Sequence, residues 1–575
     1  MEIKEVIIGS IKTALFSLKI DDSKIKEIGL EHPEDISHGD YSTNVAMVLS
    51  KLVAQNPREL AEKVVAEILE RKPKEIEKIE VAGPGFINFY LSKDFFENKT
   101  KEIIKLGKKF GKNKSLKGQK ILVEKSAPNL FKPFHVGHLL NITIGESLTR
   151  IFNFSGSKVI PIAYPSDVSL GASKTVWAIM DKKIEDKMTI NALGECYAYG
   201  TKRYDEDEKI KKEIIDINKK INAKEFGVIW NVYKKGRDLS LKYFKDITAR
   251  LESKFSGYIY ESDAGVLGKK IVEGYIGKLF EKSEGAVIFK GEDYGLHTRV
   301  FITSQGLPVY EAKDIGLIKL KFKKYKPDIS LVITDVEQKQ YFEVIKKVAT
   351  LIYGEWGEKS MYWQHGRMHF EGGNISSRYG NVPLAEDLIN EVKKKVYEKM
   401  NSVEKKSSIK EDDSLVEHIA MSSLRYSFLR SSPGKNIIFD FDKSVSFEGD
   451  SGPYLQYSYA RAKSILRKAK VEKIKSKVSS SQIKSQFDGS SISILEKLLY
   501  RFPEVVERAG EEYSPHYIAS YLIEISSAFN NFYGNNKIVD KADLSSPYKV
   551  ALTEAFSEVL KNGLNLLGIF APEKM

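Results

Sequence analysis

Apolar positions at the start of the chain follow the period of a helix. This spacing, with charged residues in between, is seen for Ile3, Val6, Ile7, Leu15 and Leu18. We therefore expect an amphipathic helix here, and not a secretion signal. Further on, residues 81–92 pass from a Gly-Pro-Gly turn into alternating apolar and polar positions, which predicts a strand.

From Ile121 the pattern alternates between apolar strands and amphipathic helices. Strands are expected at residues 121–128, 158–164 and 329–335, and a helix at residues 137–154 that stops near Gly156. Such alternation is typical of a parallel, doubly wound α/β sheet of the Rossmann type.

The remaining segments complete a three-domain organisation. A lysine-rich linker at residues 105–120 closes a first α/β domain, 1–115. The catalytic α/β domain is expected at 116–383, with a charged helical insertion at about 174–294. Residues 384–575 alternate helical segments with serine- and lysine-rich loops, which predicts an all-helical bundle.

Composition narrows the class of protein. The chain has 575 residues, a net charge of +13 and one cysteine, Cys196. That excludes an internal disulfide framework, no CxxC pair is present for structural zinc, and a reducing cytoplasm is expected. No run of about 18 apolar residues is present to span a membrane. The positive charge favours a nucleic-acid partner, although a lysine-rich solvated surface explains it equally well.

The segment around His135, Gly137 and His138 carries the strongest chemical signal. It lies where a strand and loop give way to a helix, whose N-terminus offers donors and positive potential to a phosphate. Gly137 leaves room for a nucleotide beside the backbone. Nucleotidyl transfer needs such fixed donors, because charge builds on the α-phosphate oxygens. The alternative is a pair of helix-capping histidines.

His135-Val136-Gly137-His138 resembles the HIGH signature of class I aminoacyl-tRNA synthetases. Their second signature, KMSKS, is matched by residues 374–378, where asparagine and serine replace both lysines. The resemblance places Ser376, Ser377 and Arg378 at the ATP phosphates. A polar turn is the alternative for this short segment.

Within class I, several longer segments are similar to the arginyl-tRNA synthetase family. They are residues 126–138, 376–381, 81–89, 446–469 and 567–575. The resemblance implies that arginine and Mg-ATP form arginyl-adenylate, that tRNA-Arg accepts the arginine, and that activation requires bound tRNA. It also implies that the enzyme is monomeric, with no tightly bound cofactor.

The expected arginine pocket contains carboxylates, because a guanidinium is planar, permanently charged and carries five donors. Glu124 ends the first strand of the sheet, and Tyr310 and Asp314 share a face if their segment is helical. The resemblance assigns these three residues to the guanidinium. It places Ser126, Asn129 and Gln338 near the substrate's amino and carboxylate groups. Asp167 either lines this site or is a turn aspartate.

Candidate RNA contacts lie in the two outer domains. Phe86 and Asn88 are placed at the tRNA elbow by the resemblance, with a role in the core as the alternative. The spacing of Tyr454, Tyr457 and Arg461 suits unstacked bases of the anticodon loop, although aromatic stripes often pack inside a protein. Met575 is expected near the same loop.

Lys132 is expected to replace the lysine that the second signature lacks. It stands three residues before His135, and members of the family without the loop lysine tend to carry one here. We therefore expect Lys132, His135, His138 and Arg378 to act in catalysis. A solvated loop lysine is the alternative.

Three other functions remain open from the sequence. They are a nucleotidyltransferase that makes a small metabolite, a non-catalytic tRNA-binding relative, and a class I synthetase for another amino acid. A strict tRNA requirement would exclude the first, burst formation of AMP with arginine and tRNA would exclude the second, and the acidic guanidinium pocket argues against the third.

Overall fold

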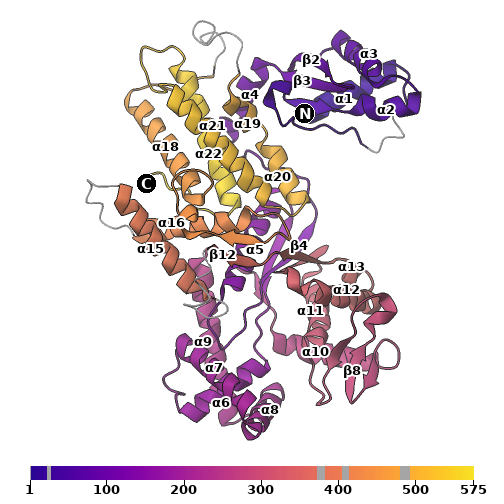
Figure 1. The fold of residues 1–575 in the computed structure, drawn as a ribbon, viewed down its shortest axis with the longest axis vertical. Helices are drawn as coiled ribbons and strands as arrows, with labels where there is room; N and C mark the ends of the chain where they lie inside the picture. The colour runs from indigo at the N-terminus through magenta and orange to yellow at the C-terminus, as the bar shows by residue number, and fades with distance from the viewer. Residues whose placement is uncertain (1, 22–26, 372–382, 404–412, 479–491) are drawn as a thin grey trace. The chain divides into compact units, whose positions relative to one another are not determined.

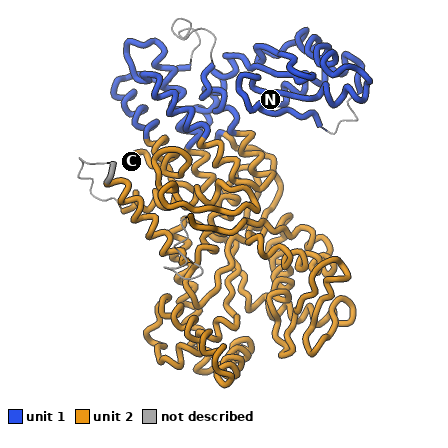
Figure 2. The backbone as a smooth tube through the Cα atoms, viewed as in Figure 1, with its two compact units in different colours: residues 1–110, 461–502, 524–560 blue, residues 111–460, 503–523, 561–575 orange. Residues whose placement is uncertain are grey.

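The chain forms two compact units, shown in different colours in Figure 2. The computed structural model describes residues 2–21, 27–371, 383–403, 413–478 and 492–575. Unit 1 contains residues 1–110, 461–502 and 524–560, and unit 2 contains the remainder. None of the described helices is both long and apolar enough to cross a membrane.

Unit 1 begins with a three-stranded antiparallel sheet of order β1-β3-β2 and its helices (Figure 1). Its elements are α1 (Ile3–Ser17), β1 (Tyr41–Thr43), α2 (Val45–Val53), α3 (Pro57–Glu70), β2 (Ile76–Ala82), β3 (Phe86–Leu91) and α4 (Lys93–Leu106). Ile3, Ile7 and Leu15 of α1 are buried, as the helical spacing predicts. The strand expected after the Gly-Pro-Gly turn is confirmed as β3, which follows the turn from β2.

Unit 1 also contains α19 (Ile494–Leu499) and the adjacent parts of three long helices, α18 (Gly452–Val471), α21 (His516–Asn535) and α22 (Ser546–Leu566). Phe529 of α21 stacks on Phe556 of α22, with ring centroids 4.0 Å apart. The unit therefore joins an N-terminal α/β layer to segments from the far end of the chain.

Unit 2 is built on five parallel strands in the order β11-β10-β4-β5-β6. Their bounds are β4 (Lys120–Ser126), β5 (Lys158–Ala163), β6 (Gly257–Tyr258), β10 (Ile329–Asp335) and β11 (Ser360–His365). The sheet grows from β4 through β5 in one direction and from β10 through β11 in the other. This confirms the doubly wound α/β fold and makes the carboxyl ends of β4 and β10 its switch point.

Helices cover both faces of this sheet. On one face α5 (Val136–Phe154) packs so closely that a Cβ at Gly145 would lie 2.1 Å from the Cβ of Lys125. The other face contacts α10 (Glu261–Gly274) and α11 (Tyr310–Tyr325), where Leu122, Ala264 and Leu317 share one core. This packing brings the N-termini of α5 and α11 to the carboxyl side of the strands.

The segment expected as a helical insertion has two parts. Its first part is a helical cluster of α6 (Leu170–Lys182), α7 (Ile190–Glu206), α8 (Glu208–Asn222) and α9 (Val228–Arg250). Its second part is not purely helical, since β6 returns to the edge of the central sheet by pairing with β5. An antiparallel sheet follows, made of β7 (Glu281–Ser283), β8 (Ala286–Phe289) and β9 (Arg299–Ile302).

The later part of unit 2 is mainly helical, as expected. It contains α12 (Lys339–Tyr353), α13 (Glu355–Glu358), α15 (Ala385–Val403), α16 (Asp413–Leu429), α17 (Phe441–Ser444) and α20 (Phe502–Glu511), with the remaining parts of α18, α21 and α22. One short strand, β13 (Ile437–Phe439), pairs with β12 (Met368–Phe370). Three residues are too few for an alternating pattern to stand out in the sequence.

Candidate active site

Two strands end and one helix begins at the switch point of the central sheet. Ser126 ends β4, Asp335 ends β10, and α5 begins at Val136 with His135 as its N-cap. Ligands of open parallel sheets bind at this edge. The N-terminus of α5 adds backbone N–H donors and positive potential, which suit an anion.

The rings of the two histidines in the HVGH segment pack against each other in a tilted arrangement, with centroids 3.6 Å apart. Nδ1 of His135 accepts from the Gly137 N–H at 3.1 Å, and Nδ1 of His138 accepts from the His135 N–H at 3.4 Å. A ring nitrogen that accepts carries no proton, so each neutral ring holds its proton on Nε2. A Cβ at Gly137 would lie only 3.0 Å from the His135 ring, so glycine permits this fold of the first turn. The capping interpretation is therefore correct in geometry, and it leaves both Nε2–H groups as donors.

Burial and one neighbouring lysine keep these rings uncharged at neutral pH. Burial, with a smaller effect from Lys132, lowers the pKa of His135 to about 4. Burial also lowers the pKa of His138 well below its usual range, helped by His135 and Lys132. The ammonium group of Lys132 lies 5.2 Å from the ring centroid of Tyr197, and burial lowers its pKa as well. Lys132 is thus the cation placed beside two neutral imidazoles.

The segment that resembles KMSKS, with Ser376, Ser377 and Arg378, lies outside the described residues. The chain directly after it is held against the HVGH segment. The Val136 N–H donates to the Pro383 carbonyl at 3.0 Å, and the Ala385 N–H donates to the Phe134 carbonyl at 2.8 Å. Residues 383–385 are therefore tied to the start of the HVGH segment.

Two carboxylates lie on neighbouring elements at this edge. Asp314 of α11 accepts a 2.7 Å hydrogen bond from the Tyr341 hydroxyl. Burial, helped by Glu124 and Glu261, raises the pKa of Asp314 to about 7 although Tyr341 and Lys321 act in the opposite direction. Glu124 is itself paired with Lys321 at 2.6 Å, and both side chains are nearly fully buried. A guanidinium that reaches this site therefore meets Asp314 as its less compensated carboxylate.

The other predicted arginine contacts differ in their exposure and in their hydrogen bonds. Tyr310 begins α11 and is 58% exposed, one turn before Asp314. Ser126 is buried, and its Oγ has no hydrogen-bond partner among the described residues. Asn129 lies in the following loop and bridges to Ser166. Gln338, in the short helix η4 (Val336–Gln338), is exposed and accepts from the Thr334 hydroxyl.

Asp167 has a structural role, which decides between its two interpretations. It accepts from Arg237 Nε at 3.1 Å and from the Ser262 N–H and hydroxyl at 2.9 Å each. Because α9 carries Arg237 and α10 carries Ser262, Asp167 joins the helical insertion to the sheet. It is not a free ligand for substrate.

Three residues of the acidic pocket, Tyr341, Lys321 and Glu261, are not among the contacts expected from the sequence. Tyr341 follows Gln338 by three positions, and Lys321 follows Asp314 by seven on the same helix, so helical spacing around those two would have found both. Glu261 gives no such signal, because it lies in the segment expected as the insertion. It is buried and ion-paired with Lys313.

Comparison with known proteins decides the family. A catalytic domain described as tRNA synthetases class I (R) matches residues 100–441. The arginyl-tRNA synthetase N-terminal domain matches residues 1–91, and the DALR anticodon-binding domain matches residues 455–575. The arginine–tRNA ligase of Fusobacterium nucleatum is 31% identical over 96% of each chain.

The chain belongs to the arginyl-tRNA synthetase family. The arginine–tRNA ligase of Halothermothrix orenii is 30% identical over 98% of each chain. Among solved structures, the arginyl-tRNA synthetases of Thermus thermophilus and Plasmodium falciparum share the fold, each with a TM-score of 0.78 and 21% identity. The match covers 99% and 100% of this chain, respectively, and all of theirs. Membership of the family sets aside the small-metabolite nucleotidyltransferase and the synthetase for another amino acid.

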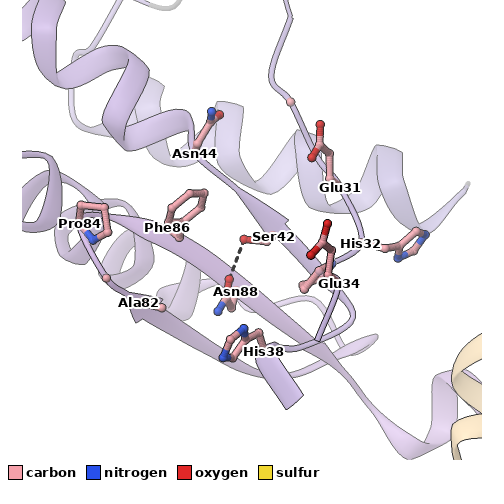
Figure 3. A pocket seen from close by; sticks show the side chains of 13 residues that line it. Glu31, His32, Glu34, His38, Ser42, Asn44, Ala82, Pro84, Phe86 and Asn88 are labelled. Atoms are coloured by element: carbon pink, nitrogen blue, oxygen red, sulfur yellow. Dashed lines mark hydrogen bonds between the residues drawn. The ribbon is translucent and has the colours of Figure 1, made fainter. Parts of the chain in front are cut away.

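The part that matches the family's N-terminal domain carries an open pocket of about 520 Å³ (Figure 3). It is lined by Gly29, residues 31–34, His38, Ser42, Asn44, residues 82–84, Phe86 and Asn88. Phe86 is 39% exposed, whereas Asn88 is buried and accepts a 2.7 Å hydrogen bond from the Ser42 hydroxyl. That bond orients the Asn88 amide, so the pocket offers an aromatic face and a fixed amide side by side.

Three of the four predicted anticodon contacts share one helix, α18. Tyr454 and Tyr457 lie in its first two turns, and Tyr457 is 38% exposed. Arg461 lies one turn further, hydrogen-bonds to Asn530 and lies 5.1 Å from the Tyr533 ring centroid. Met575 is partly exposed at the chain terminus. The DALR match spans Tyr457, Arg461 and Met575 and begins one residue after Tyr454.

Proposed function

We propose that this protein is an arginine–tRNA ligase that activates arginine with Mg-ATP and transfers it to the 3′ end of tRNA-Arg as a monomer. The observation that carries the proposal is the buried carboxylate of Asp314, which lies near Glu124 of β4 at the edge of the sheet where α5 begins. A permanent cation and a nucleotide triphosphate are the ligands that these two features suit.

Arginine binds with its guanidinium on Asp314 and Glu124. Tyr310 covers the planar group at the more exposed side, and Tyr341 keeps the Asp314 carboxylate in place. Ser126, Asn129 and Gln338 receive the amino and carboxylate groups. Lys321 holds Glu124, so the empty pocket does not carry two uncompensated buried charges.

Adenylate formation needs positioning and charge stabilisation, not a covalent enzyme intermediate. A carboxylate oxygen of arginine attacks the α-phosphorus of Mg-ATP, the bond to the β-phosphate oxygen breaks, and pyrophosphate leaves. The Nε2–H groups of His135 and His138 donate to the phosphate oxygens, and Lys132 supplies positive charge. Ser376, Ser377 and Arg378 act from the second signature. Donors fixed before the reaction need no reorganisation as charge develops.

In the second step the terminal ribose hydroxyl of the tRNA attacks the carbonyl carbon of the adenylate. AMP leaves, and the arginyl ester stays on the RNA. Phe86 and Asn88 bind the elbow of the tRNA, and Tyr454, Tyr457, Arg461 and Met575 contact the anticodon loop. Base stacking on aromatic side chains and phosphate contacts by cations are the usual means of RNA recognition.

Charging of total tRNA with each of the twenty labelled amino acids tests this function. We expect label in tRNA only from arginine. Label from another amino acid would overturn the specificity, and no label from any amino acid would favour a non-catalytic tRNA-binding relative. In addition, ATP–pyrophosphate exchange should require both arginine and tRNA-Arg. Equal exchange without tRNA would contradict the proposed dependence of activation on RNA.

A further inference from the structure

Tyr500 lies far from the N-terminal domain in sequence but inside its core. Only 4% of its surface is exposed. Its ring centroid lies 5.4 Å from that of Phe95 and 5.6 Å from that of Phe96, both edge-on. It also lies 6.2 Å from Tyr41 and 5.9 Å from His32. Contacts of this kind add to burial and fix ring orientation.

His32 connects this aromatic cluster to the open pocket that holds Phe86 and Asn88, which we call the elbow pocket. It lines the pocket, and in Figure 3 its ring points away from Phe86 and Asn88. The ring lies 4.4 Å from Tyr41, and Nδ1 lies 2.7 Å from the Asp40 carbonyl oxygen. The pocket wall at residues 29–38 contains only one turn of 3-10 helix and a single bridge to β1. Side-chain contacts therefore fix the position of residues 29–38.

The segment that carries Tyr500 also presents cations to a buried carboxylate of the same domain. Lys497 Nζ lies 3.8 Å from Asp40 Oδ1, while Asp40 Oδ2 accepts from the Leu91 N–H at 2.8 Å. Burial raises the pKa of Asp40, and the Leu91 N–H, Lys497 and Arg501 counteract this. Charge complementarity at the contact thus adds to the aromatic packing.

The same segment is fixed at its other end to the long helices of unit 1. Ser493 and Glu496 form a capping box that begins α19. The other carboxylate oxygen of Glu496 accepts from the hydroxyl of Tyr548, which lies on α22. A continuous set of contacts therefore runs from α22 through α19 and Tyr500 to the pocket wall at His32.

We propose that Tyr500 is a positioning residue for tRNA recognition, which holds His32 and the wall of the elbow pocket in register with the helical part of unit 1. The inference rests on the proposed function, because it assumes that a tRNA nucleotide occupies this pocket. Tyr500 does not touch the RNA. It sets the pocket geometry in advance, so that bound RNA does not have to order the wall.

The experiment compares Tyr500→Leu with Tyr500→Phe in the full-length protein. Leucine keeps an apolar side chain but removes the ring contacts with His32 and Tyr41, whereas phenylalanine keeps the ring. We expect Tyr500→Leu to raise the KM for tRNA-Arg about tenfold with kcat within about twofold, a size typical of coupled contacts. Tyr500→Phe should keep the KM for tRNA-Arg at its wild-type value.

Phe110→Leu is the matched control. Phe110 stacks on Phe502, two residues beyond Tyr500, with ring centroids 6.2 Å apart, and it does not line the pocket. It should lower the midpoint of thermal unfolding about as much as Tyr500→Leu and leave the KM for tRNA unchanged. If the KM for tRNA is raised in both Phe110→Leu and Tyr500→Leu, the effect of Tyr500→Leu comes from a general loss of stability. That result would overturn the proposal.

A double-mutant cycle with Asn88→Ala shows whether Tyr500 acts through the pocket. If it does, the double variant should have a KM for tRNA no higher than about twice that of the worse single variant. Fully additive effects would overturn the positioning role. The proposed function fails separately, if the wild-type protein does not charge tRNA or if Asn88→Ala leaves the KM unchanged.

Discussion

The proposed arginine pocket and the proposed elbow pocket differ in the chemistry that they offer to a ligand. Asp314 and Glu124 are carboxylates at a buried edge, and each already has a partner, Tyr341 or Lys321. The elbow pocket is open and pairs an exposed ring, Phe86, with an amide, Asn88. The first site suits a permanent cation, and the second suits a neutral base.

This difference predicts how strongly a substitution at each site weakens ligand binding. A buried carboxylate that loses its partner, or a cation that loses its carboxylate, costs several kcal/mol. A base stacked on one ring contributes about 1–3 kcal/mol, and the contact tolerates changes of sequence. Substitutions in the arginine pocket should therefore act strongly on one small substrate. Substitutions in the elbow pocket should act moderately on tRNA alone.

The largest effect is expected for Asp314→Asn. Because the guanidinium then lacks its less compensated carboxylate, kcat/KM for arginine should fall about 10³-fold, mostly through KM, while the KM for ATP stays nearly constant. Steady-state charging measures both values. Asp263→Asn, which changes an exposed acid of α10, is the control. An unchanged KM for arginine in Asp314→Asn would show that the pocket is assigned wrongly.

Lys132→Ala tests the charge beside the two histidines. Loss of one fixed stabiliser of transition-state charge should lower kcat by about 10²–10³, with a modest change in the KM for arginine. Ser377→Lys, which restores the lysine of the second signature, should recover part of the loss. Lys187→Ala removes an exposed lysine as a control. Near wild-type kcat in Lys132→Ala would make Arg378 the next candidate.

Phe86→Leu tests the elbow pocket. Loss of stacking should raise the KM for tRNA-Arg about tenfold and leave kcat and the KM for arginine nearly unchanged. Phe16→Leu is a matched control, because Phe16 lies on α1 of the same domain and is 84% exposed. If both variants charge tRNA like the wild type, Phe86 does not contact the RNA.

The smallest effect is expected from pH. The pKa of Asp314 is raised to about 7, so below pH 7 the carboxyl becomes neutral while the guanidinium of arginine keeps its charge. The KM for arginine should therefore fall about eightfold as pH rises from 6 to 7.5. His135, with its pKa near 4, does not titrate in this window. Asp314→Asn should abolish the pH dependence, and a dependence that persists in this variant would assign it to another group.

The sequence by itself determined the features that local physics controls. Helical spacing placed Tyr310 and Asp314 on one helix, now seen as α11, and the strand–loop–helix pattern placed His135 and His138 at the start of another, α5. The chemistry of a guanidinium required carboxylates, and β4 and β10 appear close to where alternation predicted them. Each of these follows from residues close together in the chain, so a pattern in the sequence records it.

Only the tertiary structure decided which distant residues meet. It paired Glu124 with Lys321, gave Asp314 a donor from Tyr341, and placed Tyr500 in the N-terminal core. It also made Asp167 a structural joint between α9, α10 and the sheet. Such pairs depend on how strands order and helices cross, and a buried charge looks the same in sequence whether its partner is a substrate or a lysine on another element.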